Sequence, residues 1–403
     1  MKLKLWEEIQ SARNKIQKVI LRTPMLYSDA ISRLAGKEVH LKLENLQKTG
    51  SFKIRGAYYK LSQLDPSIKK GGVVAASAGN HAQGVAFASS LLGIRSTIVM
   101  PEGASIAKQV ATRSYGGEVL LFGQDMEECL SYARKLEEGG KYFIHPFDDE
   151  EVIAGQGTIG LEILEELPEV EEIVVPTGGG GLISGIATIV KKRRPKVKIT
   201  GVQTASAPSA FYSWKRKKIV GVKVKPTLAD GIAIGKVGEF TFPIIEQKVD
   251  RILTVEEDEI ASAILILMEK QRVVAEGAGA SPLAALLSRP GEIKTKKVVL
   301  VISGGNIDVH LLDRIIEKGL ARTGRVVRFG VILRDVPGAL AKLTGLVAGL
   351  KANILHIIHE RGAKEIPIGF SKVILVLETR GPDHICEIEK GLEEKDYSLQ
   401  RLS

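Results

Sequence analysis

The chain has 403 residues, of which 44% are hydrophobic and 26% are charged, a composition typical of a globular protein with two or three domains. It contains no run of about 18 apolar residues, and its first segment, MKLKLWEEIQ, carries charges at every turn, so we expect neither a membrane partner nor a secretory leader. The formal net charge of +10 would suit a nucleic-acid partner, but no zinc-finger spacing, RNA-binding aromatic pattern or basic zipper accompanies it, and we expect no nucleic acid either.

The densest basic run is KKRRPKVK, at residues 191–198. It follows an apolar helical pattern and contains Pro195, a residue that cannot continue a helix. The run therefore predicts the solvated end of a helix, where cations interact favourably with the helix dipole.

Short β-branched runs alternate with helical stretches from about residue 39 to residue 320. Examples are VVAAS at residues 73–77, EIVVP at 172–176 and VVLVIS at 298–303, each of which precedes a helical pattern. Strands that alternate with helices predict repeated βαβ units and parallel sheets covered on both faces. Because ligands of such sheets bind beyond the carboxyl ends of the strands, the residues after each strand are the candidates for a site.

The stretch KTGSFKIRGA, at residues 48–57, places Lys53 beside Phe52 at the start of a helical pattern. Taken alone, a lysine in the first turn of a helix is usually a surface residue. Two further turns carry polar groups at strand ends: SAGNH at residues 77–81 and SGGN at 303–306. A single Asn80 would more often be a helix cap than a ligand.

Four consecutive glycines, Gly178 to Gly181, lie between a strand and a helix. Unshielded N–H groups at a helix N-terminus form a cradle for an anion, and we predict a phosphate there. The loop is neither a Walker A motif, because Leu182 follows the glycines, nor a dinucleotide fingerprint, because Ser184 stands where its last glycine would be. An anion cradle, a lysine, an amide and a hydroxyl at one sheet edge suit a phosphorylated aromatic aldehyde that bonds to the lysine.

The pattern changes near residue 322, where RTGR reads as a linker that we place at residues 321–327. Residues 328–403 then show the order strand, helix, strand, strand, helix, strand, which is the ferredoxin-like order. We therefore predict a second domain of that class after the catalytic domain, residues 1–320.

The motifs SFKIRGA, SAGNHAQG, GGGGLISG, TLADG, EGAGA and SGGN occur in this order over about residues 5–320. Jointly they are specific, and the set resembles the fold-type II pyridoxal-phosphate enzymes, above all the threonine dehydratases, with serine dehydratases and serine racemases as relatives. The resemblance implies an α/β fold like that of the tryptophan synthase β subunit, in which a small parallel α/β domain, about residues 50–150, is inserted in a larger one. The tail, from DVPGALAKL onward, resembles an ACT regulatory domain.

The resemblance also implies roles for individual residues. Lys53 would hold pyridoxal 5'-phosphate as a Schiff base and remove the Cα proton of the substrate, with Phe52 packed against the cofactor ring. Asn80 would bond the phenolic oxygen of the ring, and Ser303 would face its pyridine nitrogen. The residues implied to contact the cofactor are Phe52, Lys53, Asn80, Gly178, Gly179, Gly180, Gly181, Leu182, Glu276 and Ser303. The turn implied to hold the substrate carboxylate consists of Ser77, Ala78, Gly79 and His81.

The activity implied is the β-elimination of water from L-threonine, which gives 2-oxobutanoate and ammonia, together with the deamination of L-serine to pyruvate. Serine racemases carry a second base, a serine, where this chain has Ala78, so we expect elimination rather than racemisation. Their carboxylate metal ligands are replaced by Gln203 and Ser209, so we expect no metal at that position. The alternatives are a serine dehydratase or racemase, an enzyme similar to threonine synthase or cysteine synthase, and a non-enzymatic amino-acid-binding regulator.

An ACT domain implies regulation by an amino acid, with isoleucine and valine as candidates, and pairing of subunits into a homodimer or homotetramer. The residues implied to line the effector site are Pro337, Gly338, Ala339, Leu340, Asn353 and Ile354. Cys129 and Cys386 belong to no metal-ligand spacing, and we interpret them as free thiols of a cytoplasmic protein.

Overall fold

The computed structural model describes residues 4–362 and 366–402 and divides the chain into two compact units. The first unit ends at Asp308 and the second begins at Val309. Each unit has its own hydrophobic core, and we describe each by itself.

The larger sheet of the first unit has the strand order β1-β2-β10-β7-β8-β9. Every neighbouring pair is parallel except β1 and β2, which are antiparallel. The strands β7 and β10 are buried along almost their whole length, as expected for a parallel sheet covered on both faces. The six strands are β1 (Met25–Tyr27), β2 (Glu38–Leu43), β7 (Glu172–Pro176), β8 (Lys198–Thr204), β9 (Arg251–Val255) and β10 (Lys297–Ile302).

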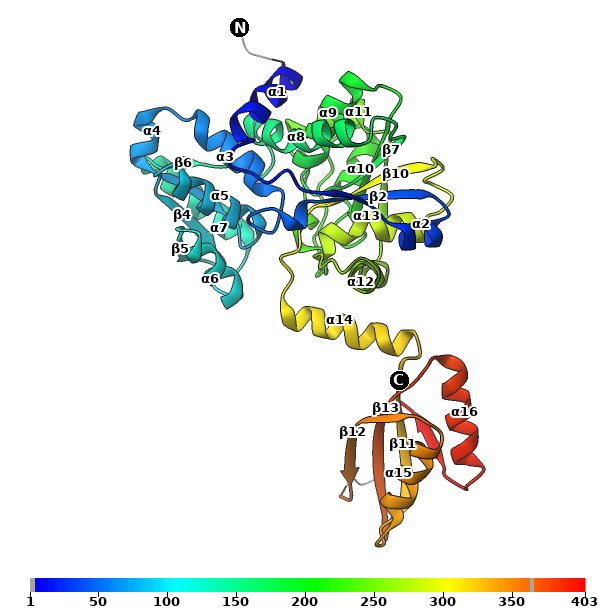
Figure 1. Ribbon diagram of the computed structural model, residues 1–403. Helices are drawn as coiled ribbons and strands as arrows, with labels where there is room; N and C mark the ends of the chain where they lie inside the picture. Colours follow the sequence, from blue (N-terminus) through cyan, green and yellow to red (C-terminus); the bar gives the residue numbers. More distant parts are fainter. Residues whose placement is uncertain (1–3, 363–365, 403) are drawn as a thin grey trace. The chain divides into compact units, whose positions relative to one another are not determined.

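The smaller sheet has the order β5-β4-β3-β6, and all of its pairs are parallel. Its strands are β3 (Val73–Ala76), β4 (Ser96–Met100), β5 (Glu118–Leu121) and β6 (Tyr142–Phe143), and the associated helices are α3 (Lys53–Gln63), α4 (Pro66–Gly71), α5 (Asn80–Leu91), α6 (Ile106–Ser114) and α7 (Met126–Glu138). The four strands of the smaller sheet lie in the chain between β2 and β7 of the larger sheet (Figure 1).

The helices associated with the larger sheet include α8, which packs against α3 on one side and α9 on the other. Glycines allow this close packing, because a Cβ atom at Gly155 would overlap the carbonyl group of Arg55, and one at Gly185 would lie 2.8 Å from the Cα atom of Gly157. These helices are α1 (Leu5–Ile16), α2 (Asp29–Ala35), α8 (Glu150–Glu166), α9 (Gly181–Arg193), α10 (Ser209–Arg216), α11 (Thr241–Lys248), α12 (Glu257–Ile266) and α13 (Gly277–Ser288), with short helical turns at η1 (Glu44–Leu46), η2 (Asp230–Ile232) and η3 (Leu267–Gln271).

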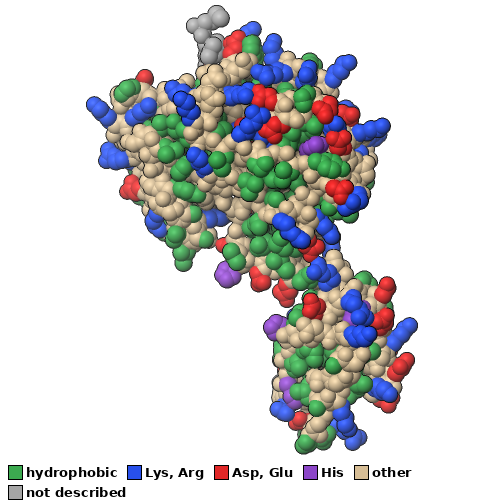
Figure 2. All heavy atoms as spheres, in the orientation of Figure 1, with side chains coloured by type: hydrophobic (Ala, Val, Ile, Leu, Met, Phe, Trp, Pro, Cys, Tyr) green, Lys and Arg blue, Asp and Glu red, His purple; other side chains and the backbone are tan. Residues whose placement is uncertain are grey.

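The predicted end of a helix at the basic run is confirmed, since α9 ends at Arg193 with basic residues in its last turn. Lys191 forms an ion pair of 2.8 Å with Asp250. On the face of the molecule drawn in Figure 2, lysine and arginine side chains are interspersed with acidic ones. Within the described residues, no helix is long and apolar enough to cross a membrane. Both cysteines are free thiols, Cys129 buried and Cys386 exposed.

The second unit contains an antiparallel sheet of order β12-β13-β11-β14. Its elements are α14 (Val309–Arg322), β11 (Val326–Arg334), α15 (Ala339–Gly349), β12 (Asn353–Glu360), β13 (Phe370–Glu378), α16 (Pro382–Glu393) and β14 (Leu399–Arg401). After α14, the order is the predicted strand, helix, strand, strand, helix, strand. The unit boundary, however, precedes the expected one at residue 320, because α14 packs against β11 and so belongs to the second unit.

Candidate active site

Three strand ends of the first unit carry the polar turns that the sequence singled out. The strand β3 ends at Ala76 and α5 begins at Asn80; β7 ends at Pro176 and α9 begins at Gly181; β10 ends at Ile302, directly before Ser303. Each turn therefore lies at the carboxyl end of a parallel strand, which is where ligands of such sheets bind.

Lys53 is the first residue of α3, and its side chain is partly buried. Its Nζ atom donates a hydrogen bond of 2.9 Å to the carbonyl oxygen of Pro146 and lies 5.3 Å from the centre of the Phe52 ring. Burial lowers the pKa of Lys53 from 10.5 to about 8, although the Glu276 carboxylate acts in the opposite direction. A much larger fraction of the amine is thus unprotonated near neutral pH than for an exposed lysine, which is what a nucleophile requires.

Asn80, Glu276 and Asn306 form a hydrogen-bonded group near Lys53. The Nδ2 atom of Asn80 donates to both carboxylate oxygens of Glu276, at 2.7 and 2.9 Å, and its Oδ1 atom accepts from Asn306 Nδ2 at 2.8 Å. Burial, together with the charge of the nearby Asp230, raises the pKa of Glu276 to about 7. Asn80 and Glu276 were predicted from the sequence as site residues. Asn306, which ends the SGGN motif, was not.

The pKa values of Lys53 and Glu276 are shifted toward each other. A lysine and a glutamate in water differ by about 6 units, whereas here the values are about 8 and about 7. Moving a proton between these two groups therefore costs little free energy compared with the same transfer in water. Two titratable groups with such values at one site are typical of acid–base catalysis.

The glycine loop, residues 178–181, is held by the turn before α11. The carbonyl oxygen of Gly179 accepts hydrogen bonds from Thr241 Oγ1 at 2.7 Å and from the backbone N–H of Gly238 at 3.2 Å. Gly180 has a φ of +102°, which favours glycine, and a Cβ atom at Gly179 would overlap the ring of Phe147. The four glycines are therefore required by backbone conformation and close packing, and the loop ends at the positive end of the α9 dipole.

A buried amide lies beside this loop. Gln156 is 1% exposed, and neither polar atom of its side chain has a hydrogen-bond partner within the described part of the chain. Its Oε1 atom lies 2.9 Å from the position that a Cβ atom of Gly181 would take. Buried amides rarely stay unpaired in native proteins, so this side chain indicates a ligand or water at the cradle. Leu182, in contrast, is part of the hydrophobic core, so only its backbone N–H could face a phosphate.

The turn at residues 77–81 is held by one side-chain hydrogen bond of its own and by others to neighbouring segments. Ser77 Oγ accepts from the backbone N–H of Gly79 at 3.2 Å, and Ala78 and Gly79 are partly exposed. The His81 ring is buried and donates from Nε2 to the carbonyl oxygen of Ile144 at 3.0 Å, because a carbonyl can only accept. Burial and the charge of Lys53 lower the pKa of His81 to about 3, so the ring is neutral. The His81 side chain thus holds the wall of the site, and a contact with substrate would come from its backbone.

The residues around Ser303 fix the start of α3. The backbone N–H of Phe52 donates to the carbonyl oxygen of Ser303 at 3.1 Å, and Ser51 forms an isolated bridge with Gly304. Phe52 is 9% exposed and packs in the core of the larger sheet, and Ser303 is 2% exposed. This pairing places Lys53 next to the end of β10.

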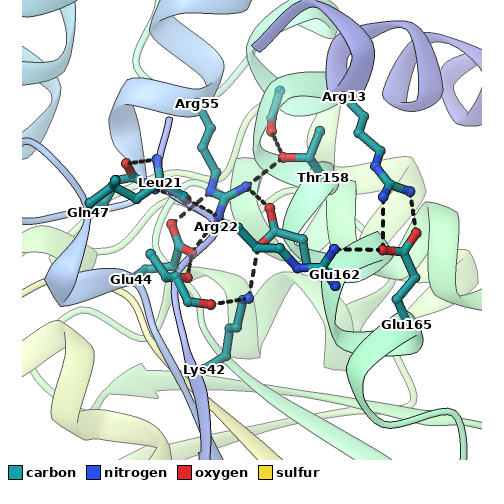
Figure 3. Close-up of polar contacts among 12 residues, drawn as sticks. Arg13, Leu21, Arg22, Lys42, Glu44, Gln47, Arg55, Thr158, Glu162 and Glu165 are labelled. Atoms are coloured by element: carbon teal, nitrogen blue, oxygen red, sulfur yellow. Dashed lines mark hydrogen bonds and ion pairs between the residues drawn. The ribbon is translucent and has the colours of Figure 1, made fainter. Parts of the chain in front are cut away.

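A buried charge network anchors α3 from its other side (Figure 3). The Arg55 guanidinium donates to both oxygens of Glu44, at 2.7 and 2.8 Å, and to both oxygens of Glu162, at 2.6 and 3.0 Å. Lys42 forms an ion pair of 2.8 Å with Glu162. The side chains of Arg55, Glu44 and Lys42 are 0% exposed. Burial alone would lower the pKa of Arg55, but Glu44 and Glu162 outweigh it and raise the pKa, so the guanidinium is always charged.

A segment that sequence reasoning missed joins β6 to α8. It consists of His145, Pro146, Phe147, Asp148 and Asp149 and is called here the 145–149 segment. Pro146 accepts from Lys53, Phe147 packs against Gly179, and Asp149 caps α8 by accepting from the N–H of Val152 at 3.0 Å. The local sequence HPFDD signals a turn and a helix cap, but it does not reveal that the segment reaches both the lysine and the glycine loop.

The remaining candidate positions lie elsewhere. Gln203 and Ser209, where metal ligands would stand, are both buried and hydrogen-bond each other at 3.4 Å. Within the described residues, no group of three or more histidine, cysteine or acidic side chains could hold a metal. A wide recess of about 780 Å³ lies between Tyr27, Arg33, His40 and Lys296, but it includes none of the groups described above.

The chain is similar to known proteins in sequence and in fold. The family described as pyridoxal-phosphate dependent enzyme matches residues 16–304. The chain is 52% identical over 395 residues to the L-threonine ammonia-lyase of Thermotoga maritima, with 98% of each chain covered. The solved structure of threonine deaminase isoform 2 from Solanum lycopersicum is 36% identical with a TM-score of 0.74, over 78% of this chain and 87% of its own. Maize serine racemase is 34% identical with a TM-score of 0.74, over 78% and 98% of the two chains.

Proposed function

The chain belongs to the family of pyridoxal-phosphate dependent enzymes, and we propose that it is a threonine ammonia-lyase that converts L-threonine to 2-oxobutanoate and ammonia. The observation that carries the proposal is the placement of Lys53, whose pKa is lowered to about 8. Its Nζ atom donates to Pro146 of the 145–149 segment, which also packs against Gly179 of the glycine loop, and the charge of the Asn80-bonded Glu276 acts on it. The relatives that match the chain over nearly its whole length carry the same activity in their names.

The residues present fit pyridoxal phosphate. The glycine loop offers backbone N–H groups at a helix N-terminus, with the unpaired amide of Gln156 beside it, and Lys53 offers an amine with a lowered pKa. When bound, the cofactor supplies an aldehyde that bonds to an amine and a ring that accepts electrons from Cα of an amino acid. We assign Lys53 to that bond, residues 178–181 to the phosphate, Asn80 to the phenolic oxygen and Ser303 to the pyridine nitrogen.

Lys53 then serves as the base of the reaction. Its amine takes the proton from Cα of the substrate, and the ammonium so formed would return a proton to the β-hydroxyl, which leaves as water. Hydrolysis of the released enamine then gives 2-oxobutanoate and ammonia. The backbone of the turn at residues 77–81 binds the substrate carboxylate. Glu276, whose pKa is raised to about 7, accepts hydrogen bonds from Asn80 Nδ2 and so holds the amide that we assign to the phenolic oxygen.

Racemisation requires a second base on the opposite face of Cα. The position that carries this base in racemases is Ala78, which has no ionisable group. The structural similarity to maize serine racemase thus extends to the fold, whereas the methyl group of Ala78 favours elimination. L-Serine, which lacks only the methyl group of threonine, is the second substrate that we propose.

The proposal is tested by product analysis. The purified protein, loaded with pyridoxal phosphate, is incubated with L-threonine, L-serine, O-acetylserine and O-phosphohomoserine, and 2-oxo acids, ammonia and D-serine are quantified. We expect equal amounts of 2-oxobutanoate and ammonia from L-threonine, and pyruvate from L-serine. D-Serine as the main product would instead identify a racemase, and turnover of phosphohomoserine alone would identify an enzyme similar to threonine synthase.

The second unit is, in our proposal, an ACT regulatory domain that binds an amino acid and pairs two chains. A recess of about 390 Å³ is lined by residues 333–340 together with His359, Arg361 and Ser371. It contains an ion pair of 2.9 Å between Asp335 and Arg361, whose opposite charges suit the ammonium and carboxylate groups of an amino acid. The expected residues Pro337 to Leu340 line this recess, whereas Asn353 and Ile354 lie at the opposite end of β12 from His359 and do not.

A substitution in the proposed effector site should abolish regulation of the enzyme by an amino acid. Isoleucine, valine and the other amino acids are titrated against initial rates with L-threonine. We expect one of them to change KM or kcat, and Arg361→Gln to abolish that change while basal rates persist. The matched control is Arg380→Gln, which removes an exposed ion pair with Glu387 in the same unit and should leave regulation intact. A full-length enzyme that responds to no amino acid would refute the regulatory proposal.

A further inference from the structure

Asp148 binds the turn that precedes α11. Its carboxylate accepts three backbone hydrogen bonds, from Glu239 at 3.0 Å, from Phe240 at 2.9 Å and from Thr241 at 3.1 Å. A Cβ atom at Gly238 would overlap this carboxylate, so the turn fits closely around it. The first N–H groups of a helix have no partner within the helix, and an acidic group from a distant part of the chain satisfies them here.

The same turn holds the glycine loop. Thr241 Oγ1 and the N–H of Gly238 both donate to the carbonyl oxygen of Gly179, at 2.7 and 3.2 Å. In a planar trans peptide the C=O and N–H groups point in opposite directions. Fixing the carbonyl of Gly179 toward the turn therefore fixes the N–H of Gly180 in the opposite direction, at the start of α9.

We propose that Asp148 is a positioning residue for the phosphate of the cofactor, acting through the turn at residues 238–241 and the Gly179–Gly180 peptide. The inference rests on the proposed function, because it assigns the loop at residues 178–181 to that phosphate. Asp148 does not touch the ligand in this account. It sets the direction of a backbone donor, and preorganised donors bind an anion without the cost of reorienting them.

His145 holds Asp148 in turn. Its Nδ1 atom accepts from the N–H of Asp148 at 2.7 Å and from the N–H of Phe147 at 3.3 Å, which closes the 145–149 segment into a tight turn. Phe147 packs on Gly179 from the same segment. The segment therefore supports the loop through a ring contact and through the Asp148 carboxylate.

The test compares two ligands that differ only in the phosphate. Apoenzyme is titrated with pyridoxal phosphate and with pyridoxal, and binding is followed by absorbance. In Asp148→Asn one carboxylate oxygen is replaced by an NH2 group, which is a donor. At least one of the three backbone N–H groups then faces a donor and loses its hydrogen bond. We expect the Kd for pyridoxal phosphate to rise about 10- to 100-fold, while the Kd for pyridoxal changes less than about twofold.

A second pair of variants keeps the proposal falsifiable if Asp148→Asn fails to fold. Thr241→Val removes the hydroxyl that donates to Gly179, and we expect the same selective loss, whereas Thr241→Ser retains the hydroxyl and should restore affinity. The control is Glu239→Gln. The Glu239 side chain is 80% exposed and pairs only with Lys236 among the described residues. The affinity of this variant for pyridoxal phosphate should be unchanged. Equal loss for both ligands, or no loss in either variant, would overturn the positioning role, whereas a wild-type protein that binds neither ligand would refute the proposed function.

Discussion

Replacing Lys53 with alanine is expected to lower kcat for L-threonine by at least about 10³-fold, because the change removes both the amine that bonds to the cofactor and the base that takes the Cα proton. Lys48, the nearest lysine along the sequence, is exposed to solvent and serves as the comparison below. The glycine loop is unchanged in this variant, so we expect the cofactor to bind without a covalent bond. Activity is measured as release of 2-oxobutanoate.

Borohydride reduction identifies the residue directly. In the wild type it should attach the cofactor to the peptide that contains Lys53, and in Lys53→Ala no peptide should be labelled. Lys48→Ala is the matched control and should retain full activity. Because burial lowers the pKa of Lys53 to about 8, the apoenzyme should bond the aldehyde at a rate that reaches half its maximum near pH 8 and rises toward higher pH. A label on another lysine, or a rate that rises only near pH 10.5, would contradict the assignment.

Replacing Arg55 with methionine is expected to lower the free energy of unfolding of the apoenzyme by about 3–5 kcal/mol, because it leaves two buried carboxylates with one buried cation. Glu44 and Glu162 each receive two hydrogen bonds from Arg55, and within the described residues only Lys42 remains as a buried positive charge beside them. Methionine fills much of the same volume, so the loss reports on charge rather than on a cavity. The measurement is unfolding in urea.

Arg22→Met is the control for the Arg55 prediction. Arg22 also pairs with two glutamates, Glu165 and Glu166, but its side chain is 52% exposed. Exposed ion pairs contribute about 0–1 kcal/mol, so this variant should unfold almost like the wild type. Equal destabilisation by the two substitutions would show that burial does not determine the strength of the Arg55 network. Because α3 begins at Lys53, a loosened network should also lower kcat.

The fold and the three turns of the site could be predicted from sequence because each depends on local signals. A β-branched run followed by glycine or a small polar residue and then a helical pattern is enough to place Asn80, Gly178 to Gly181 and Ser303 at strand ends. Parallel topology brings the ends of β7 and β10 to one edge of the larger sheet. The expectation that all these turns share one sheet edge is wrong, because β3, which precedes Asn80, belongs to the smaller sheet. The boundary between the two units differs from the expected residue 320, since a helical pattern alone does not reveal that α14 packs on β11.

The contacts of the supporting residues could not be predicted, because the residues that they join are far apart in the sequence. Glu276 reaches Asn80 across 196 positions, and Asp148 reaches Thr241 across 93. Arg55 is part of the SFKIRGA motif, yet the motif does not indicate that Glu162, a residue of α8, bonds to it. An acidic residue considered alone is expected to be exposed to solvent. Only the packing of α3 against α8 shows that Glu162 is a buried partner of Arg55.

The glycine contacts of α8 have a consequence for protein engineering. The helices α3, α8 and α9 are in close backbone contact at Gly155, Gly157 and Gly185. These contacts fix the distance between Lys53, at the start of α3, and the glycine loop, at the start of α9. A change of side-chain rotamer cannot alter that distance. Libraries that vary these glycines should yield few folded members. Redesign for larger amino acids should leave this three-helix template untouched and randomise Phe147 and Ala78, where side chains border the site.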